Sequence, residues 1–177
     1  MPRVSEKPAS FTGNSKKLQT QKETNMKKIL AAAAISTAGL MPAEAETIEI
    51  RTNGSTPAVI GTADNFTGQA VISPLYPPTD MTRASTGLVN FAPGARTVWH
   101  SHPAGQMLII TGGQGWVQEE GKERRGINPG DVVWIPAGVK HWHGATAISP
   151  MTHIALSYMQ DGKNVDWLEP VSDEQYR

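Results

Sequence analysis

Cysteine is absent from the 177 residues of this sequence. Its absence excludes disulfide bonds, catalysis by a thiolate, and zinc or iron–sulfur sites built on thiolate ligands. Long hydrophobic runs are absent too. The longest run of apolar and small residues, Ile29–Met41, has 13 residues, which is too short to cross the roughly 30 Å hydrocarbon core of a bilayer as a helix.

The chain also lacks a net charge, but its charges are unevenly distributed. Residues 1–45 carry seven Lys and Arg against three Asp and Glu, whereas residues 46–177 carry nine against 13. The acidic balance of the longer part lacks the positive field on which nucleic-acid binding depends, so it argues against a DNA or RNA partner. The length suits a single domain of ordinary size.

The first 45 residues have the character of a leader rather than of a folded domain. Residues 1–25 are polar with few large apolar side chains, so we expect a disordered extension, with Met26 as the true start. Residues 26–45 combine two lysines, the run Ile29–Met41 and an Ala-Glu-Ala cleavage site, the three parts of a secretory signal peptide. A buried helix of a longer cytoplasmic protein is the alternative. The signal peptide predicts a mature domain of residues 46–177 that is secreted to the periplasm and free of the membrane.

Residues 46–177 follow the pattern of an all-β protein. Short apolar or alternating runs are separated by glycine and proline turn signals, such as those at 128–130 and 136–138. Their regular spacing predicts a β-sandwich or barrel. Only the C-terminal part offers a short helical turn, with Ser172 as its N-cap. The expected strands are Gln69–Ile72, Thr86–Phe91, Met107–Thr111, Gly115–Gln118, Val132–Ile135 and Thr152–Met159.

The histidines are concentrated in one stretch of this domain. All five lie between positions 100 and 153, and four form the His-x-His pairs His100/His102 and His141/His143. In a strand, residues i and i+2 point to the same face, so each pair can present two imidazoles to one side of a sheet. This arrangement predicts a metal site with nitrogen and oxygen ligands, open to Mn, Fe, Co, Ni, Cu or Zn. Scattered core or surface histidines are the alternative.

Two spaced motifs surround these pairs: Gly94-(x5)-His100-Ser101-His102-(x3)-Gln106-(x6)-Gly113 and Gly130-(x5)-Pro136-Ala137-Gly138-(x2)-His141. Both resemble the two conserved motifs of the cupin superfamily. The resemblance implies a single-domain antiparallel jelly-roll β-barrel whose interior holds one divalent metal ion. The metal ligands that it implies are His100, His102, Gln106 and His141.

Gln106 departs from the glutamate found at this position in many cupins. A glutamine offers a neutral carbonyl oxygen, so three neutral imidazoles and one amide leave the charge of a divalent cation uncompensated. Such a centre is a stronger Lewis acid and is less suited to a higher oxidation state. The glutamine therefore favours lyase, isomerase or hydrolase chemistry over oxygen activation.

Two further histidines are candidate catalytic residues. His143 shares the face of His141 if the strand continues, and its ordinary pKa near 6.5 suits a general acid or base. His153 lies on an expected strand, with Ile154, Leu156 and Tyr158 at the opposite parity, but parity alone does not say which face points inward. A structural core histidine is the alternative for each of them.

Trp99 and Trp142 lie beside these histidines with the opposite parity, so we expect both to face outward from the barrel. An exposed patch of large apolar side chains indicates an interaction surface. We therefore expect a homodimer or a higher homo-oligomer. Cover by N-terminal strands around residues 48–60 is the alternative.

A narrower resemblance extends over nearly all of residues 66–177. Segments 91–106, 130–144, 151–156 and 165–176 resemble small bacterial cupins that include the manganese-dependent (R)-selective hydroxynitrile lyases. The resemblance implies cleavage of a small-molecule cyanohydrin to an aldehyde and HCN. It implies Mn2+ as the metal, with Fe2+, Ni2+ or Zn2+ as alternatives, and His143 as the group that moves the hydroxyl proton.

Two other functions remain open at this point. One is an Fe(II)-dependent dioxygenase of small organic molecules. The other is a non-catalytic periplasmic cupin that binds a metal or a small ligand.

Overall fold

The computed structural model describes residues 47–177 of the chain. The predicted extension and signal peptide, residues 1–25 and 26–45, lie outside the described residues and stay predictions, as does the periplasmic location. Within residues 47–177, no helix is both long enough and apolar enough to span a membrane.

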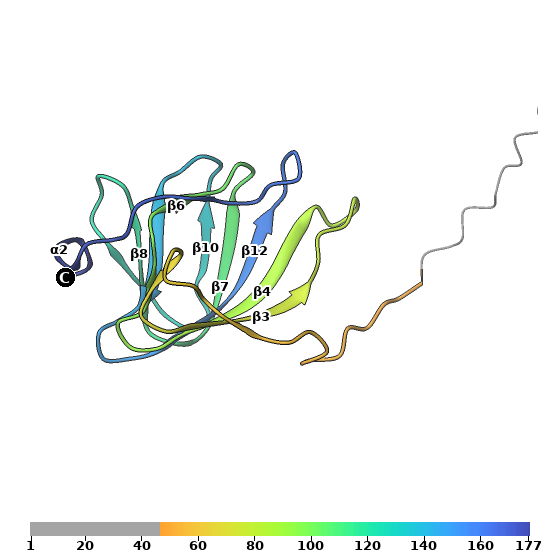
Figure 1. The fold of residues 1–177 in the computed structure, drawn as a ribbon, viewed down its shortest axis with the longest axis horizontal. Coiled ribbons are helices and arrows are strands. Elements are labelled where there is room, and N and C mark those ends of the chain that lie inside the picture. Colours follow the sequence, from red (N-terminus) through yellow and green to blue (C-terminus); the bar gives the residue numbers. More distant parts are fainter. Residues whose placement is uncertain (1–46) are drawn as a thin grey trace, which may run out of the picture. The chain divides into compact units, whose positions relative to one another are not determined.

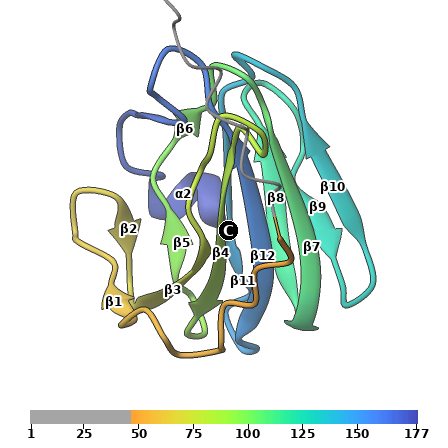
Figure 2. The ribbon, with the colours of Figure 1, turned by 90° about the vertical axis from the view of Figure 1, so that its right-hand side faces the viewer.

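Two antiparallel sheets make up the domain and curl around a common interior (Figures 1 and 2). The first sheet has the spatial order β1 (Val59–Ile60), β3 (Ala70–Tyr76), β4 (Ala84–Phe91), β12 (Met151–Tyr158), β7 (Gln106–Gly113) and β10 (Val132–Ile135). The second has the order β13 (Asp166–Trp167), β6 (His100–Ser101), β11 (His141–Ala145), β5 (Arg96–Thr97) and β2 (Phe66–Thr67), with β8 (Gly115–Glu119) and β9 (Arg125–Ile127) attached through β11. This arrangement confirms the predicted all-β barrel.

The six strands expected from the sequence all overlap strands of the structure. Val132–Ile135 has the predicted bounds, and the bounds of four others differ by no more than two residues at either end. The expected strand Gln69–Ile72 is too short, because β3 continues to Tyr76. The sequence did not predict β1, β2, β5, β6 and β13, because each has only two residues. Two residues are too few for an alternating pattern to appear.

Cross-strand rows on the inner face of the first sheet change character along the barrel. Phe91 and Met151 are register partners in the row at one end, and both are buried. At the other end, Ser157 pairs with Ser85 on one side and with Gln106 on the other. The apolar rows bury their side chains away from water, which stabilises the fold, while the polar row leaves hydrogen-bonding groups at the opposite end.

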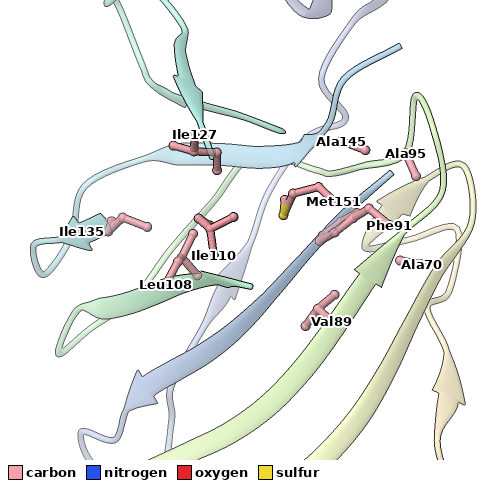
Figure 3. Packing of buried hydrophobic residues seen from close by; sticks show 10 residues of the cluster. All are labelled: Ala70, Val89, Phe91, Ala95, Leu108, Ile110, Ile127, Ile135, Ala145 and Met151. Carbon is pink, nitrogen blue, oxygen red and sulfur yellow. The ribbon is translucent and has the colours of Figure 1, made fainter. Parts of the chain in front are cut away.

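Apolar side chains from both sheets pack together inside the barrel (Figure 3). The cluster of buried residues consists of Ala70, Val89, Phe91, Ala95, Leu108, Ile110, Ile127, Ile135, Ala145 and Met151.

Glycine is required where the chain passes close to this core. Gly113 ends β7 with a φ of 71°, and a Cβ there would lie 1.8 Å from the carbonyl oxygen of Pro150. A Cβ on Gly144 would lie 2.5 Å from the carbonyl oxygen of Ala95, so only glycine lets β11 approach β5 this closely.

The outward-facing tryptophans do not form the exposed patch that we expected. Trp99 and Trp142 are 3% and 0% exposed, because residues of the C-terminal segment pack over them. Val171, Tyr176 and the half-buried Trp116 complete this aromatic cluster. The cover thus comes from the C-terminal segment and not from a second subunit or from residues 48–60. The tryptophans therefore give no support to the predicted homodimer, which stays a prediction.

The predicted C-terminal helical turn is confirmed and anchors this cover. Helix α2 (Asp173–Tyr176) begins at Ser172, whose side chain accepts a hydrogen bond from the backbone of Gln175 in a capping box. The buried guanidinium of Arg96 donates to the carbonyl oxygen of Val171 and pairs with Asp173 at 2.8 Å. It also lies over the ring of Tyr176, 4.5 Å from its centroid.

Truncating Tyr176 should therefore destabilise the whole barrel. Tyr176 is buried, and its hydroxyl donates to the carbonyl oxygen of Ala145 at 2.8 Å. We expect Tyr176→Ala to lower the free energy of unfolding by about 3 kcal/mol, because a buried aromatic ring is lost. We expect Tyr176→Phe to lower it by only about 1 kcal/mol, because only the hydrogen bond is lost. Urea unfolding followed by tryptophan fluorescence measures both, and equal stability of all three proteins would contradict this cover.

Candidate metal centre

Two of the predicted ligands face each other directly across the second sheet. His100 on β6 and His141 on β11 are register partners, and their ring centroids are 4.1 Å apart. Both side chains are buried. The cross-strand pairing therefore brings together one ligand from each predicted motif, His100 and His141, which are 41 positions apart in the sequence.

His102 lies just beyond β6, in a loop that glycines hold in place. Its carbonyl oxygen accepts hydrogen bonds from the backbone N–H groups of Gly105 and Gly138, at 3.3 and 2.9 Å. Both glycines have positive φ angles, 86° and 74°, which other residues rarely adopt. The two motif loops are thus tied to each other, and the ring of His102 lies 5.1 Å from that of His100 and 5.5 Å from that of His141.

Three of the histidines share one mode of anchoring. Nδ1 of His100 bonds the carbonyl oxygen of Val98, and Nδ1 of His141 bonds that of Val139, both at 2.9 Å. Nδ1 of His102 bonds the carbonyl oxygen of Asn164 at 2.5 Å. A carbonyl oxygen can only accept, so each Nδ1 carries the hydrogen and each Nε2 has a free lone pair. Nε2 of His102 and of His141 is buried without a hydrogen-bond partner.

Gln106 is anchored in the complementary way. Its Nε2 donates to the hydroxyl of Ser157 at 3.0 Å. Its Oε1 is buried and meets no hydrogen-bond partner. Buried polar atoms without partners are rare in folded proteins, so such an atom is a candidate for binding a ligand or an ion. The amide oxygen and the imidazole nitrogens are together the donor set that a divalent metal ion accepts.

His143 differs from these three histidines, because neither of its ring nitrogens has a hydrogen-bond partner. It is buried on β11, and its ring centroid lies 5.3 Å from that of His100. One ring nitrogen each from His100, His141 and His143 lies within 4.8 Å of the others, a spacing that could hold a metal ion. The structure thus places His143 beside the predicted ligands, as its parity on the strand predicts.

His153 is fully buried on β12 and belongs to the inward face of that strand. Its ring packs against that of His143, with centroids 4.9 Å apart, and against Phe91. The choice that parity left open is thus decided by burial, because Met151 and Ser157 on the same parity are also buried. His153 therefore lies between His143 and the apolar core residue Phe91.

A cavity of about 290 Å³ opens between these histidines and the first sheet. Apolar side chains form most of its wall, and in the part of the chain that the structure describes no Lys, Arg, Asp or Glu lines it. Trp167 lies at 39% exposure over His100, its register partner, with ring centroids 4.9 Å apart. The lining residues that carry the later argument are His100, His102, Gln106, His143, Ser157 and Asn164.

Sequence reasoning missed Ser85, Ser157, Asn164 and Trp167 as parts of this site. A signal for Ser157 was present, because it lies four residues after His153 and therefore on the same strand face. Asn164 and Trp167 follow a turn whose path the sequence pattern does not specify.

Burial keeps the imidazoles neutral. It lowers the pKa of His141 and of His153 from 6.5 to about 4. It also holds the pKa of His100 and of His143 well below the usual value, because a charged imidazole loses its hydration in the barrel. Neighbouring histidines lower the pKa of His143 further. All of these rings are therefore neutral at neutral pH, the form that binds a metal ion or accepts a proton.

A β-barrel with a buried cluster of histidines beside an amide belongs to a class of small barrels whose interior could hold a metal ion. Residues 87–156 match the model of the cupin domain. A protein named (R)-mandelonitrile lyase, from Granulicella tundricola, is 52% identical over 130 residues, which cover 73% of this chain and 99% of that protein. The chain belongs to the cupin family.

Solved structures agree with this assignment. A cupin-like protein from Thermotoga maritima is 42% identical, with a TM-score of 0.62 over 73% of this chain and 96% of its own. The polyketide cyclase RemF from Streptomyces resistomycificus is 14% identical, with a TM-score of 0.59 over 73% of this chain and 91% of its own. At that identity the second likeness concerns the fold alone.

The lowered pKa values predict how the stability of the metal-free protein depends on pH. Between about 4 and 6.5, His141 and His153 are neutral in the folded chain but bind protons when unfolded. Their contribution is fully present above pH 6.5 and is lost as pH falls toward 4. For each of these two histidines, the free energy of unfolding falls by up to about 1.4 kcal/mol for every unit by which the pH is lowered in this range.

Urea unfolding with a chelator present, at several pH values in this range, measures this loss. The variant His153→Gln should flatten the slope, whatever its absolute stability. A free energy of unfolding that does not change between these pH values would contradict the burial of neutral imidazoles.

Proposed function

We propose that the protein is a metal-dependent lyase that cleaves a small neutral cyanohydrin to an aldehyde and HCN. Its metal ligands are His100, His102, Gln106 and His141, its metal is Mn2+, and His143 moves the proton. One observation carries the proposal: Nδ1 of His100, His102 and His141 and the amide nitrogen of Gln106 are hydrogen-bonded to the protein, whereas the ring nitrogens of the neighbouring His143 are not.

The hydrogen bonds at Nδ1 distinguish the proposed metal ligands from the histidine proposed to transfer the proton. A histidine that binds a metal ion usually donates its other ring N–H to a carbonyl or carboxylate, which fixes the ring and the tautomer. His100, His102 and His141 all do so. His143 and His153 both have their ring nitrogens unpartnered, so the protein does not fix their tautomers. Of the two, His143 is the one whose ring lies against the rings of the ligands His100 and His141. A ring that must take up and give back a proton needs that freedom.

The donor set is neutral, because Gln106 supplies an amide oxygen in place of a carboxylate. A divalent cation in this set supplies Lewis acidity, which lowers the pKa of a hydroxyl that it binds. The amide also leaves the cavity wall without a fixed negative charge, and a departing cyanide ion meets no repulsion from the wall.

His143 accounts for the proton. It is neutral at neutral pH because burial and the nearby histidines hold its pKa below the usual value. It accepts the proton of the substrate hydroxyl, and the electron pair of the O–H bond forms the aldehyde C=O. The C–C bond breaks, its pair leaves with cyanide, and His143 returns the proton to give HCN. The atoms and charges of cyanohydrin and products balance.

The cavity fits a neutral substrate with an apolar substituent. Its wall includes Phe66, Phe91, Val89 and Val165, and the wall residues of the described chain offer no cationic side chain to a carboxylate substrate. The aromatic and aliphatic wall lowers the local polarity, which strengthens the hydrogen bonds at the ligand end. The name of the relative from Granulicella tundricola, (R)-mandelonitrile lyase, states activity on a compound of this type.

Alanine substitutions at the two histidines of β11 test the two roles. We expect His141→Ala to lose bound Mn2+ and activity together. We expect His143→Ala to keep its Mn2+ and to lose at least about 100-fold in kcat, the usual scale of general acid–base catalysis. Metal analysis of the purified proteins and benzaldehyde release from (R)-mandelonitrile measure both quantities.

Three results would count against the proposal. The first is Mn2+-loaded protein that releases no more benzaldehyde than the metal-stripped protein. The second is a loss of Mn2+ from His143→Ala equal to that from His141→Ala, which would make His143 a ligand. The third is oxygen consumption by Fe2+-loaded protein with the same substrates, which would favour the dioxygenase.

A further inference from the structure

Gln106 poses a problem of orientation that the barrel has to solve. Its amide has an oxygen at one end and an NH2 group at the other, and the two ends have nearly the same shape. Only the oxygen can bind a cation. With the oxygen toward the cavity, the NH2 group points into the protein, where it is buried and needs an acceptor.

Strand register places such an acceptor opposite the amide. Ser157 on β12 is the register partner of Gln106 on β7, so both side chains leave the same face of the sheet at neighbouring positions. The hydroxyl of Ser157 accepts from Nε2 of Gln106 at 3.0 Å. Both residues are buried, so bulk water has little access to this bond.

The cross-strand row that contains Gln106 and Ser157 extends to β4 and is connected there to a second proposed ligand. Ser85 on β4 is the other register partner of Ser157, and its hydroxyl accepts from Nδ2 of Asn164 at 2.7 Å. The carbonyl oxygen of the same Asn164 receives the hydrogen bond from Nδ1 of His102. The polar row Ser85, Ser157 and Gln106, together with Asn164, therefore links two of the proposed ligands.

We propose that Ser157 is a positioning residue for the metal site: its hydroxyl holds the NH2 group of Gln106 so that the amide oxygen is presented to the cation. The inference rests on the ligand set of the proposed function, but not on its reaction. Without the hydroxyl, presenting the oxygen leaves a buried donor unsatisfied, and this cost falls on metal binding.

The pair Ser157→Thr and Ser157→Val isolates the hydroxyl, because the two side chains have nearly the same shape. We expect the threonine variant to bind Mn2+ with a Kd near that of the wild type. We expect the valine variant to bind about tenfold more weakly, which corresponds to about 1.4 kcal/mol. Titration of the metal-free proteins with Mn2+ by calorimetry measures Kd without any turnover.

A double-mutant cycle shows whether the effect passes through the amide. In the background of Gln106→Ala there is no NH2 group to hold, so Ser157→Val should cause no further loss of affinity. Ser73→Ala is a control for loss of a serine hydroxyl elsewhere in the first sheet, since Ser73 is absent from the cavity wall, and it should leave Kd unchanged.

Three results would overturn the proposal. Equal Kd values for the threonine and valine variants would show that the hydroxyl does not matter. An equal loss from Ser157→Val with and without Gln106 would show that it acts elsewhere. A purely structural role would lower the urea stability of the metal-free valine variant and leave its Kd unchanged, which also overturns it. If the protein binds Mn2+ as expected but releases no aldehyde, the lyase proposal fails and this one stands.

Discussion

The site depends on a single cross-strand contact, the register pairing of His100 with His141. Strand pairing fixes side-chain position to within a few ångströms, so two histidines far apart in sequence meet without help from a long flexible loop. The backbone carbonyl oxygens of Val98 and Val139, each two residues before its histidine, then fix the ring tautomers. Sheet geometry thus preorganises both position and protonation state, and the cost of this order is met during folding rather than during ligand binding.

Along the first sheet, the rows that stabilise the core are distinct from the row that borders the candidate site. Rows around Phe91 and Met151 are packed with apolar side chains, while the row of Ser85, Ser157 and Gln106 is polar and borders the cavity. His153 lies between them, paired with Val89 and Ile110. An ionisable group at this depth is held neutral by its surroundings, so it joins the core without carrying a buried charge.

Much of the fold could be predicted because the longer strands carry turn signals at their ends and apolar alternation along their length. The proposed ligands could be predicted because their spacing matches that of a known family. Trp99 and Trp142 show the limit of this reasoning. Parity gave the face of the sheet correctly, but the segment that covers it, with Val171 and Tyr176, lies far along the chain and carries no pairing signal. The hydrogen bonds of Asn164 were equally hidden, since they depend on where a turn returns to the barrel.

The cover over the tryptophans has a consequence for how the chain assembles. Tyr176 follows every strand of the barrel in the sequence, and the aromatic cluster of Trp99, Trp116 and Trp142 stays open until it arrives. A chain whose strands are paired but whose C-terminal segment is not yet packed exposes these apolar side chains on the outer face of the barrel. Exposed apolar surface makes incompletely folded molecules prone to aggregation. The packing of helix α2 therefore protects the barrel from aggregation, but only after the strands have paired.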